Sequence, residues 1–303
     1  MPDELIERMN EHVSAIHPDL DWETGQGRTS EHHLCLSGVG DARLRLVAER
    51  WLRRAPPADD TWEFHAARQP GDVAGGALTM DGKEVDFDRM TVAITIDEEH
   101  ERMNVVVYHP MFSAMPERLR TRFVFLALDN ALGEDDVERW VGSIDAVIAE
   151  PPGVIDLADL PARVQALAET STGESWAVLR GEREGRPIFV TVNRAIKRVD
   201  HLMFDQHTEV VFTLLSPSED GLTESAEADE LNLLEDRLLE ALGDHAVYIG
   251  RETWNGRRSM HLHVMDSGPA AAIIDRFARS MVGREVSAVP SPDPQWEVLQ
   301  RWG

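Results

Sequence analysis

Two histidines and one glutamate in the C-terminal half have the residue types and spacing of a metal site. His261 and His263 are two residues apart in an alternating segment, so on a β-strand both point to the same face of the sheet. Glu252 precedes them across an Asn-Gly turn and offers a carboxylate as a third ligand. Such ligands hold zinc or manganese and activate a bound water for hydrolysis. The alternative is that the imidazoles replace aromatic side chains on a half-buried sheet face, and we favour it because no HxxxH motif or cysteine ligand lies nearby.

Acidic and basic residues flank two turns and indicate a second kind of site. Glu23 and Arg28 flank one turn, and Glu252 with Arg257 and Arg258 flanks the other. The planar fork of arginine binds carboxylates and phosphates bidentately, so one interpretation is a pair of anion sites. The other is a cross-strand ion pair that fixes the register of each hairpin. We favour the second, because a repeated structural module explains both copies without a ligand.

Both turns belong to a pattern of ten residues that occurs twice. Residues 23–32 and 252–261 align without a gap, and six positions are identical. An amphipathic helix precedes each copy, and a short apolar strand and a second helix follow it. The repetition predicts an internal duplication that produced two related α+β domains.

The elements around the second copy define the expected fold. From residue 209 to residue 289 the pattern predicts strand, helix, strand, strand, helix, strand, the order of a ferredoxin-like domain. Asn255-Gly256 favours a tight primed turn between the two central strands, and Gly243 is expected to end the first helix. The first half lacks only the leading strand of this order, which the hairpin over residues 92–108 would supply.

The expected fold class is therefore α+β, with two ferredoxin-like domains whose antiparallel sheets are covered by helices on one face. We expect an N-terminal α+β domain over residues 1–150 and a C-terminal ferredoxin-like domain over 174–303. Residues 151–173, which carry several prolines and a Ser-Thr-Gly sequence, are expected to form the linker.

The composition narrows the class of protein. The 303 residues carry 55 Asp and Glu against 30 Lys and Arg, a formal net charge of −25, which repels phosphate backbones and excludes direct nucleic-acid binding. No apolar run is long enough to cross a membrane, and the N-terminus does not read as a signal peptide. The single cysteine, Cys35, is expected to be a packed thiol in a reducing compartment, so we expect a cytoplasmic protein.

Several segments of the second half resemble a known bacterial family. Residues 220–223, 248–253 and 255–258 resemble the family called domain of unknown function 695, and the likeness covers about residues 174–266. Residues 20–150 look like the partner domain often found beside it. The resemblance implies no activity, no cofactor and no catalytic residue. In that family the returning strand usually carries aromatics where this chain has His261 and His263.

Three functions follow as hypotheses. The first is a non-enzymatic regulatory or protein-interaction module that binds a basic protein or a second copy of itself, because no catalytic set accompanies the strongly acidic charge. The second is a metal-assisted hydrolase that uses His261, His263 and Glu252. The third is a small-ligand binding protein with a cleft between its two domains.

Overall fold

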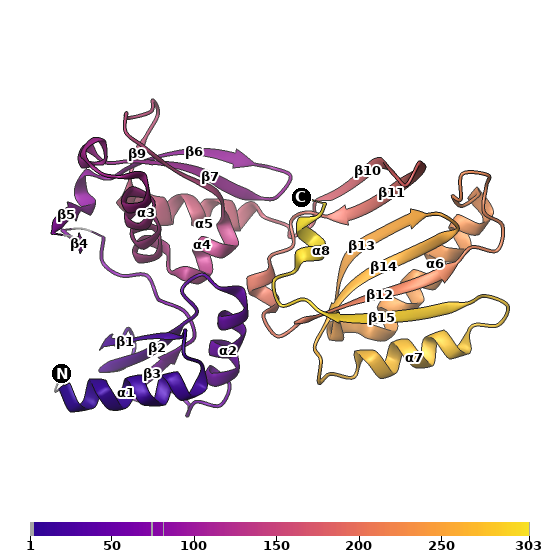
Figure 1. Ribbon diagram of the computed structural model, residues 1–303, viewed down its shortest axis with the longest axis horizontal. Helices are drawn as coiled ribbons and strands as arrows, with labels where there is room; N and C mark the ends of the chain where they lie inside the picture. The colour runs from indigo at the N-terminus through magenta and orange to yellow at the C-terminus, as the bar shows by residue number, and fades with distance from the viewer. Residues whose placement is uncertain (1–2, 74, 81, 303) are drawn as a thin grey trace. The chain divides into compact units, whose positions relative to one another are not determined.

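The alternating and periodic apolar segments of the sequence form a mixed α and β fold with several antiparallel sheets. The computed structural model describes residues 3–73, 75–80 and 82–302. The chain forms two compact units, residues 1–173 and 174–303 (Figure 1). No helix among the described residues is long and apolar enough to span a bilayer.

The first unit contains five helices among its described residues and three separate sheets. The helices are α1 (Asp3–Ile16), α2 (Ala42–Leu52), α3 (Glu117–Leu132), α4 (Glu134–Trp140) and α5 (Leu160–Thr170). The strands are β1 (Asp21–Gln26), β2 (His32–Ser37), β3 (Trp62–His65), β4 (Ala77–Met80), β5 (Lys83–Asp86), β6 (Thr91–Asp97), β7 (Arg102–Tyr108), β8 (Val141–Val147) and β9 (Ile155–Asp156). The sheet orders are β1-β2-β3, β4-β5 and β8-β7-β6-β9.

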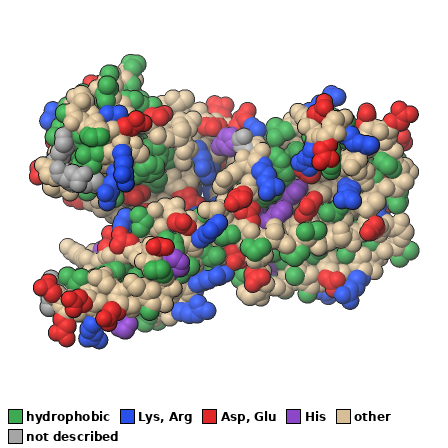
Figure 2. All heavy atoms as spheres, viewed as in Figure 1, with side chains coloured by type: hydrophobic (Ala, Val, Ile, Leu, Met, Phe, Trp, Pro, Cys, Tyr) green, Lys and Arg blue, Asp and Glu red, His purple; other side chains and the backbone are tan. Residues whose placement is uncertain are grey.

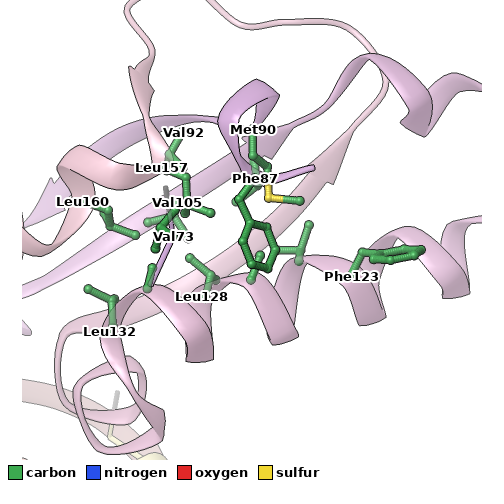
Figure 3. Close-up of a cluster of buried hydrophobic side chains, with 14 of the residues drawn as sticks. Val73, Phe87, Met90, Val92, Val105, Phe123, Leu128, Leu132, Leu157 and Leu160 are labelled. Atoms are coloured by element: carbon green, nitrogen blue, oxygen red, sulfur yellow. The ribbon is translucent and has the colours of Figure 1, made fainter. Parts of the chain in front are cut away.

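The main core of this unit lies between α3 and the β6–β7 hairpin. Figure 3 shows Phe87 and Met90 among the side chains that gather above the helix bearing Leu128 and Phe123. Leu157 and Leu160 are fully buried in the same core. Residues 151–173, which we expected to form a linker, are packed as part of this unit, because their apolar side chains join its core.

The second unit is built on one six-stranded sheet. Its strands are β10 (Trp176–Arg183), β11 (Arg186–Asn193), β12 (Gln206–Thr213), β13 (Ala246–Trp254), β14 (Arg257–Val264) and β15 (Val286–Pro292), in the order β10-β11-β13-β14-β12-β15. Every neighbouring pair is antiparallel. The helices are α6 (Ser225–Leu242), α7 (Ala270–Ser280) and the short α8 (Glu297–Gln300). Helices α6 and α7 are inserted between strands in the predicted order.

The two faces of this sheet are covered differently. Val210, Met260 and Leu262 point to one face and pack against the apolar stripes of α6 and α7. The opposite face carries Val190 and Val192 together with Trp296 from the segment before α8. Because side chains alternate along a strand, the odd-numbered residues of β12 and β14 belong to this second face. The face without the long helices is therefore covered by the C-terminal segment (Figure 1).

Local signals explain the β13–β14 hairpin. Asn255 and Gly256 have φ of 49° and 77°, as the predicted primed turn requires. The register of β13 against β14 shifts between Tyr248 and Gly250, which marks a β-bulge. A side chain at Gly250 would collide with the backbone of β11, so glycine is required where the two strands approach.

The two ten-residue repeats lie in hairpins of different kinds. The first covers most of β1, a longer loop and the start of β2, and β2 also pairs with the parallel strand β3. The β6–β7 hairpin, expected to supply a leading strand to that sheet, pairs instead with β8 and β9 in a separate sheet. That expectation is wrong, because the buried faces of β6 and β7 pack on α3 rather than beside β1.

Candidate functional site

Three potential metal ligands meet on the face of the six-stranded sheet opposite α6 and α7. Glu209 on β12 lies directly opposite His261 on β14, and Glu252 reaches the same place from β13. One ligand atom from each of the three side chains lies within 4.8 Å of the others. Ligand atoms around a tetrahedral zinc ion are about 3.3 Å apart, so a modest rotation of the side chains would close the set.

The hydrogen bonding of this cluster is incomplete. His261 is only 5% exposed, and its Nε2 has no hydrogen-bond partner. Glu209 is half-buried, and among the described residues none forms a hydrogen bond or ion pair with its carboxylate. A buried polar atom without a partner costs about 1–3 kcal/mol, so this arrangement is not explained by hydrogen bonding within the protein alone.

A second histidine orients the ring of His261. His207 on β12 stacks on it with centroids 5.2 Å apart, and His207 Nε2 lies 3.0 Å from His261 Nδ1. If His261 donates from Nδ1, its Nε2 carries a lone pair, as a metal ligand requires, and His207 serves as the outer partner typical of ligating histidines. His207 Nδ1 can then donate to the Ser291 hydroxyl, which is 3.5 Å away.

Burial keeps both imidazoles neutral. Loss of solvent lowers the pKa of His261 to about 3, with His207 the next largest cause. Burial likewise lowers the pKa of His207 to about 4, and His263 adds to the effect. A neutral imidazole is the form that binds a metal ion, so no proton must leave His261 at neutral pH before it can act as a ligand.

Glu252 already has a cationic partner. Arg183, at the end of β10, reaches across β11 and donates from Nη1 to Oε1 at 2.8 Å and from Nη2 to Oε2 at 3.1 Å. The bond to Glu252 raises the pKa of the Arg183 guanidinium. The guanidinium carbon also lies 5.3 Å from the ring centre of Trp254. Each carboxylate oxygen keeps a second lone pair for a metal ion.

His263 lies on the same face but belongs to a different set of contacts. It stands opposite His207 and stacks on Trp296 with ring centroids 4.1 Å apart. Its Nδ1 is 3.2 Å from the Phe204 carbonyl oxygen, and its Nε2 is 3.5 Å from Asp293 Oδ2. The structure thus brings together Glu252 and His261 of the predicted metal ligands and adds Glu209. His263 instead packs against aromatic side chains, in line with the alternative that the histidines replace aromatic residues on this face.

The C-terminal segment covers both histidines. The ring of Trp302 meets His261 edge-on at 4.7 Å, and the Trp302 carbonyl oxygen accepts from Arg194 Nε and Nη2 at 3.2 and 3.1 Å. Trp296 is 2% exposed and adopts the left-handed conformation, with φ of 56°. Its Nε1 donates to the carbonyl oxygen of Phe204 at 3.0 Å, so the segment is anchored at both ends.

The oppositely charged residues on either side of each repeat's turn do not pair with each other as predicted. Glu252 pairs with Arg183 rather than with Arg257, which is exposed. Arg258 points to the other face of the sheet, where it donates to Asn232 on α6 at 3.0 Å. These residues therefore do not form an anion site at the β13–β14 turn.

The first repeat shows the same departure. Glu23 accepts from Arg68 Nε at 3.2 Å, and Arg28 contributes its backbone N–H to Glu63 at 2.8 Å while its side chain is exposed. Glu63 also accepts from the backbone and hydroxyl of Thr29, and these bonds lower its pKa. The contacts of Glu23 and Arg28 stabilise the loop and the neighbouring packing within the first unit.

Sequence reasoning missed three residues of the cluster: Glu209, His207 and Arg183. The alternation of β12 does place Glu209 and His207 on one face. What the sequence does not contain is the register of β12 against β14, which brings Glu209 opposite His261. On the visible face of the second unit, acidic and basic side chains are interspersed (Figure 2).

Residues 174–301 match the family described as "Family of unknown function (DUF695)", as the resemblance predicted. The match covers almost the whole second unit, including the cluster of Glu209, Glu252 and His261. Among the curated proteins and the solved structures that were compared with the chain, none matches.

Proposed function

We propose that the C-terminal unit binds one divalent transition-metal ion through Glu209, Glu252 and His261. The observation that carries the proposal is the proximity of these ligand atoms, within 4.8 Å of one another, beside a buried His261 nitrogen that has no partner. One imidazole and two carboxylates suit Zn²⁺ or Mn²⁺ better than Ca²⁺ or Mg²⁺, which prefer oxygen ligands alone.

The number of ligands supports a role beyond structure. Structural zinc sites use four protein ligands, whereas sites with three protein ligands leave a position for water or substrate. The proposed set has three, so metal-assisted hydrolysis is the chemistry that it favours as a second step of this proposal. In that role His207 would be a positioning residue that holds the ring of His261.

The regulatory or protein-interaction role remains a prediction that rests on the net charge of −25. The ferredoxin-like architecture is likewise part of our proposal. It is supported in the second unit by the strand order β13-β14-β12-β15 with α6 and α7 inserted between strands. The common origin of the two repeats rests on their sequence identity alone.

Metal titration of the full-length protein tests the proposal. After treatment with a chelator, calorimetric titration with Mn²⁺ or Zn²⁺ should give one ion per chain. Glu209→Gln should weaken binding by at least about tenfold, since it removes one charged ligand. Glu240→Gln, at an exposed position of α6, is the matched control and should bind like the parent protein.

His261→Ala provides a second arm and should abolish stoichiometric binding. Circular dichroism of each variant shows whether the fold is retained, and Glu209→Gln carries the test if His261→Ala does not fold. Absence of stoichiometric binding to the parent protein, or unchanged binding in Glu209→Gln, would refute the assignment.

A further inference from the structure

Strand β6 of the first unit has an edge that is largely unpaired. In the sheet β8-β7-β6-β9, β9 pairs with β6 only at Thr91 and Val92. No described strand pairs with the outer edge of β6 from Ala93 to Asp97. This stretch extends about 17 Å at the usual rise of a strand, and its free N–H and C=O groups form a template for a further strand.

A groove lies beside this unpaired edge. It has a volume of about 500 Å³ and runs between β6 and α5. Ile94 and Ile96 line it from the strand, because alternate residues share one face, and Ile96 is 46% exposed. Ala166 and Leu167 line it from the helix. A strand added to β6 would therefore bury every second side chain in an apolar groove and also gain main-chain hydrogen bonds.

An outer strand of the second unit shows the opposite design. β15 lies at one end of the six-stranded sheet and also borders a groove, but it carries Pro290 and Pro292. Proline has no N–H to donate, so it protects an edge from pairing with another strand. β6 contains no proline, and its edge is left open to such pairing.

Helix α5 follows the groove from one end to the other. It begins directly after β9 and a short 3-10 turn and ends at Thr170. The carboxylate of Glu101, in the β6–β7 turn, accepts from the backbone N–H groups of Thr172 and Gly173 at 3.2 and 3.1 Å. The helix therefore runs from β9 to that turn (Figure 1). Arg163, in its first turn, lies nearer the β9 end.

The two ends of the groove differ in charge. At the β9 end, Arg163 lines the groove and is exposed, and no described residue forms an ion pair with it. At the other end, the β6–β7 turn carries Asp97, Glu98 and Glu99. A strand that continues the direction of β9 runs antiparallel to β6. Its N-terminal end therefore lies at the acidic turn and its C-terminal end at Arg163.

We propose that this groove binds the C-terminal end of a partner protein as an added strand, antiparallel to β6. Because β9 already occupies the position opposite Thr91 and Val92, a bound chain must end or turn away there, and a free C-terminus meets this limit. Its carboxylate is the ion-pair partner for Arg163. Apolar residues at alternate positions fill the groove, and basic residues upstream complement the acidic turn. The inference does not depend on the proposed metal site, which lies in the second unit.

Fluorescence anisotropy with a synthetic peptide tests the inference. The probe carries a fluorophore at its N-terminus, then two arginines, then alternating valine and threonine, and it ends in valine with a free carboxylate. The full-length protein is titrated into it. The same peptide as a C-terminal amide should bind at least about fivefold more weakly, because it lacks the charge that pairs with Arg163. A peptide of the same composition with its valines adjacent should also bind at least about fivefold more weakly.

Substitutions in the groove locate the binding. Ile96→Lys should weaken binding at least about tenfold, because it places a charge in the apolar groove near the arginines of the probe. Phe125→Lys is the matched control, since Phe125 on α3 is 45% exposed and does not line the groove. It should bind like the parent protein. Arg163→Gln should bind the acid and the amide equally, whereas Arg118→Gln, at an exposed position of α3, should keep the difference between them.

Four results would overturn the inference. The first is absence of binding to the probe, and the second is equal binding of the peptide with adjacent valines. The third is unchanged affinity in Ile96→Lys or equal binding of acid and amide to the parent protein. The fourth is a dimer of the parent protein, detected by sedimentation velocity, that Ile96→Lys dissociates, because a second copy of the chain would then fill the groove. None of these results bears on metal binding by the second unit.

Discussion

The acid–base behaviour of Asp129 gives a quantitative test of the first unit. This residue lies on α3, and burial raises its pKa from 3.8 to about 7, with Glu134 and Glu23 adding to the effect and Arg68 opposing it. Because the folded pKa lies above the unfolded one, the native state holds the proton more tightly. The stability that this proton provides is complete below about pH 4 and is lost as the pH rises through 7.

The size of the effect follows from the linkage. A pKa difference of about three units corresponds to about 4 kcal/mol, and partial exposure of the carboxyl group reduces this to about 2 kcal/mol through solvent screening. Asp129→Asn cannot ionise, so it should gain about 1 kcal/mol relative to the parent protein between pH 5 and pH 8, because part of the roughly 2 kcal/mol is already lost between pH 4 and pH 5. The pH dependence of the substitution, rather than its absolute effect, carries the test.

Native-state hydrogen exchange of peptides from α3, read by mass spectrometry at pH 5 and pH 8, measures the stability of the first unit alone. Asp145→Asn is the matched control, because Asp145 is exposed on β8, and this variant, which keeps Asp129, should exchange like the parent protein at both pH values. If the stability difference between Asp129→Asn and the parent protein is the same at both pH values, the pKa of Asp129 is not raised.

Three further substitutions or reactions test the packing. Gly250→Ala places a Cβ against a backbone oxygen of β11. In urea denaturation it should destabilise the second unit by more than about 2 kcal/mol. Gly181→Ala is the control, because its Cβ would make only an ordinary contact at 3.6 Å, and it should change the stability by less than about 1 kcal/mol. Cys35 is 1% exposed and burial raises its pKa, so a thiol reagent at pH 8 should label it only after denaturation; rapid labelling of the native protein would contradict this. Arg284→Met removes a guanidinium that is 3% exposed and 2.6 Å from a buried glutamate, and the stranded carboxylate should cost about 3 kcal/mol in the same denaturation assay; a cost near zero would contradict the pairing.

The sequence predicted the local parts of the second unit well. The Asn255-Gly256 turn is encoded by the conformational freedom of its two residues, and the end of α6 at Gly243 by the same property. The order of strands and helices from β12 to β15 follows from hydrophobic periodicity. These features depend on neighbours in the chain, which is why one sequence suffices to find them.

Pairing between distant segments was not predictable in the same way. Arg183 and Glu252 belong to strands separated by β11, and their bidentate contact depends on the full sheet order. The ion pairs expected across each turn did not form, because Arg68 and Arg183 reach Glu23 and Glu252 from other elements. Identical residue types in the two repeats therefore take their partners from whichever element packs beside them.

The face of the six-stranded sheet opposite α6 and α7 buries polar side chains, and the apolar packing does not explain them. Its apolar half, with Val190 and Val192 against Trp296, provides the burial that stabilises such a face. The polar half requires desolvation of two carboxylates and several imidazoles, which apolar residues of similar size would avoid. His207 and Arg183 satisfy part of this cluster, but one buried nitrogen of His261 has no partner.

If that polar half served packing alone, replacing Glu209 and His261 together by Leu should stabilise the unit, as it often does for buried charge pairs. If the cluster holds a metal ion, the same replacement should remove the increase in stability that Mn²⁺ or Zn²⁺ produces in the parent protein. Thermal unfolding of both proteins, with and without added metal, separates these cases, and an equal response to metal in both would place the ion elsewhere.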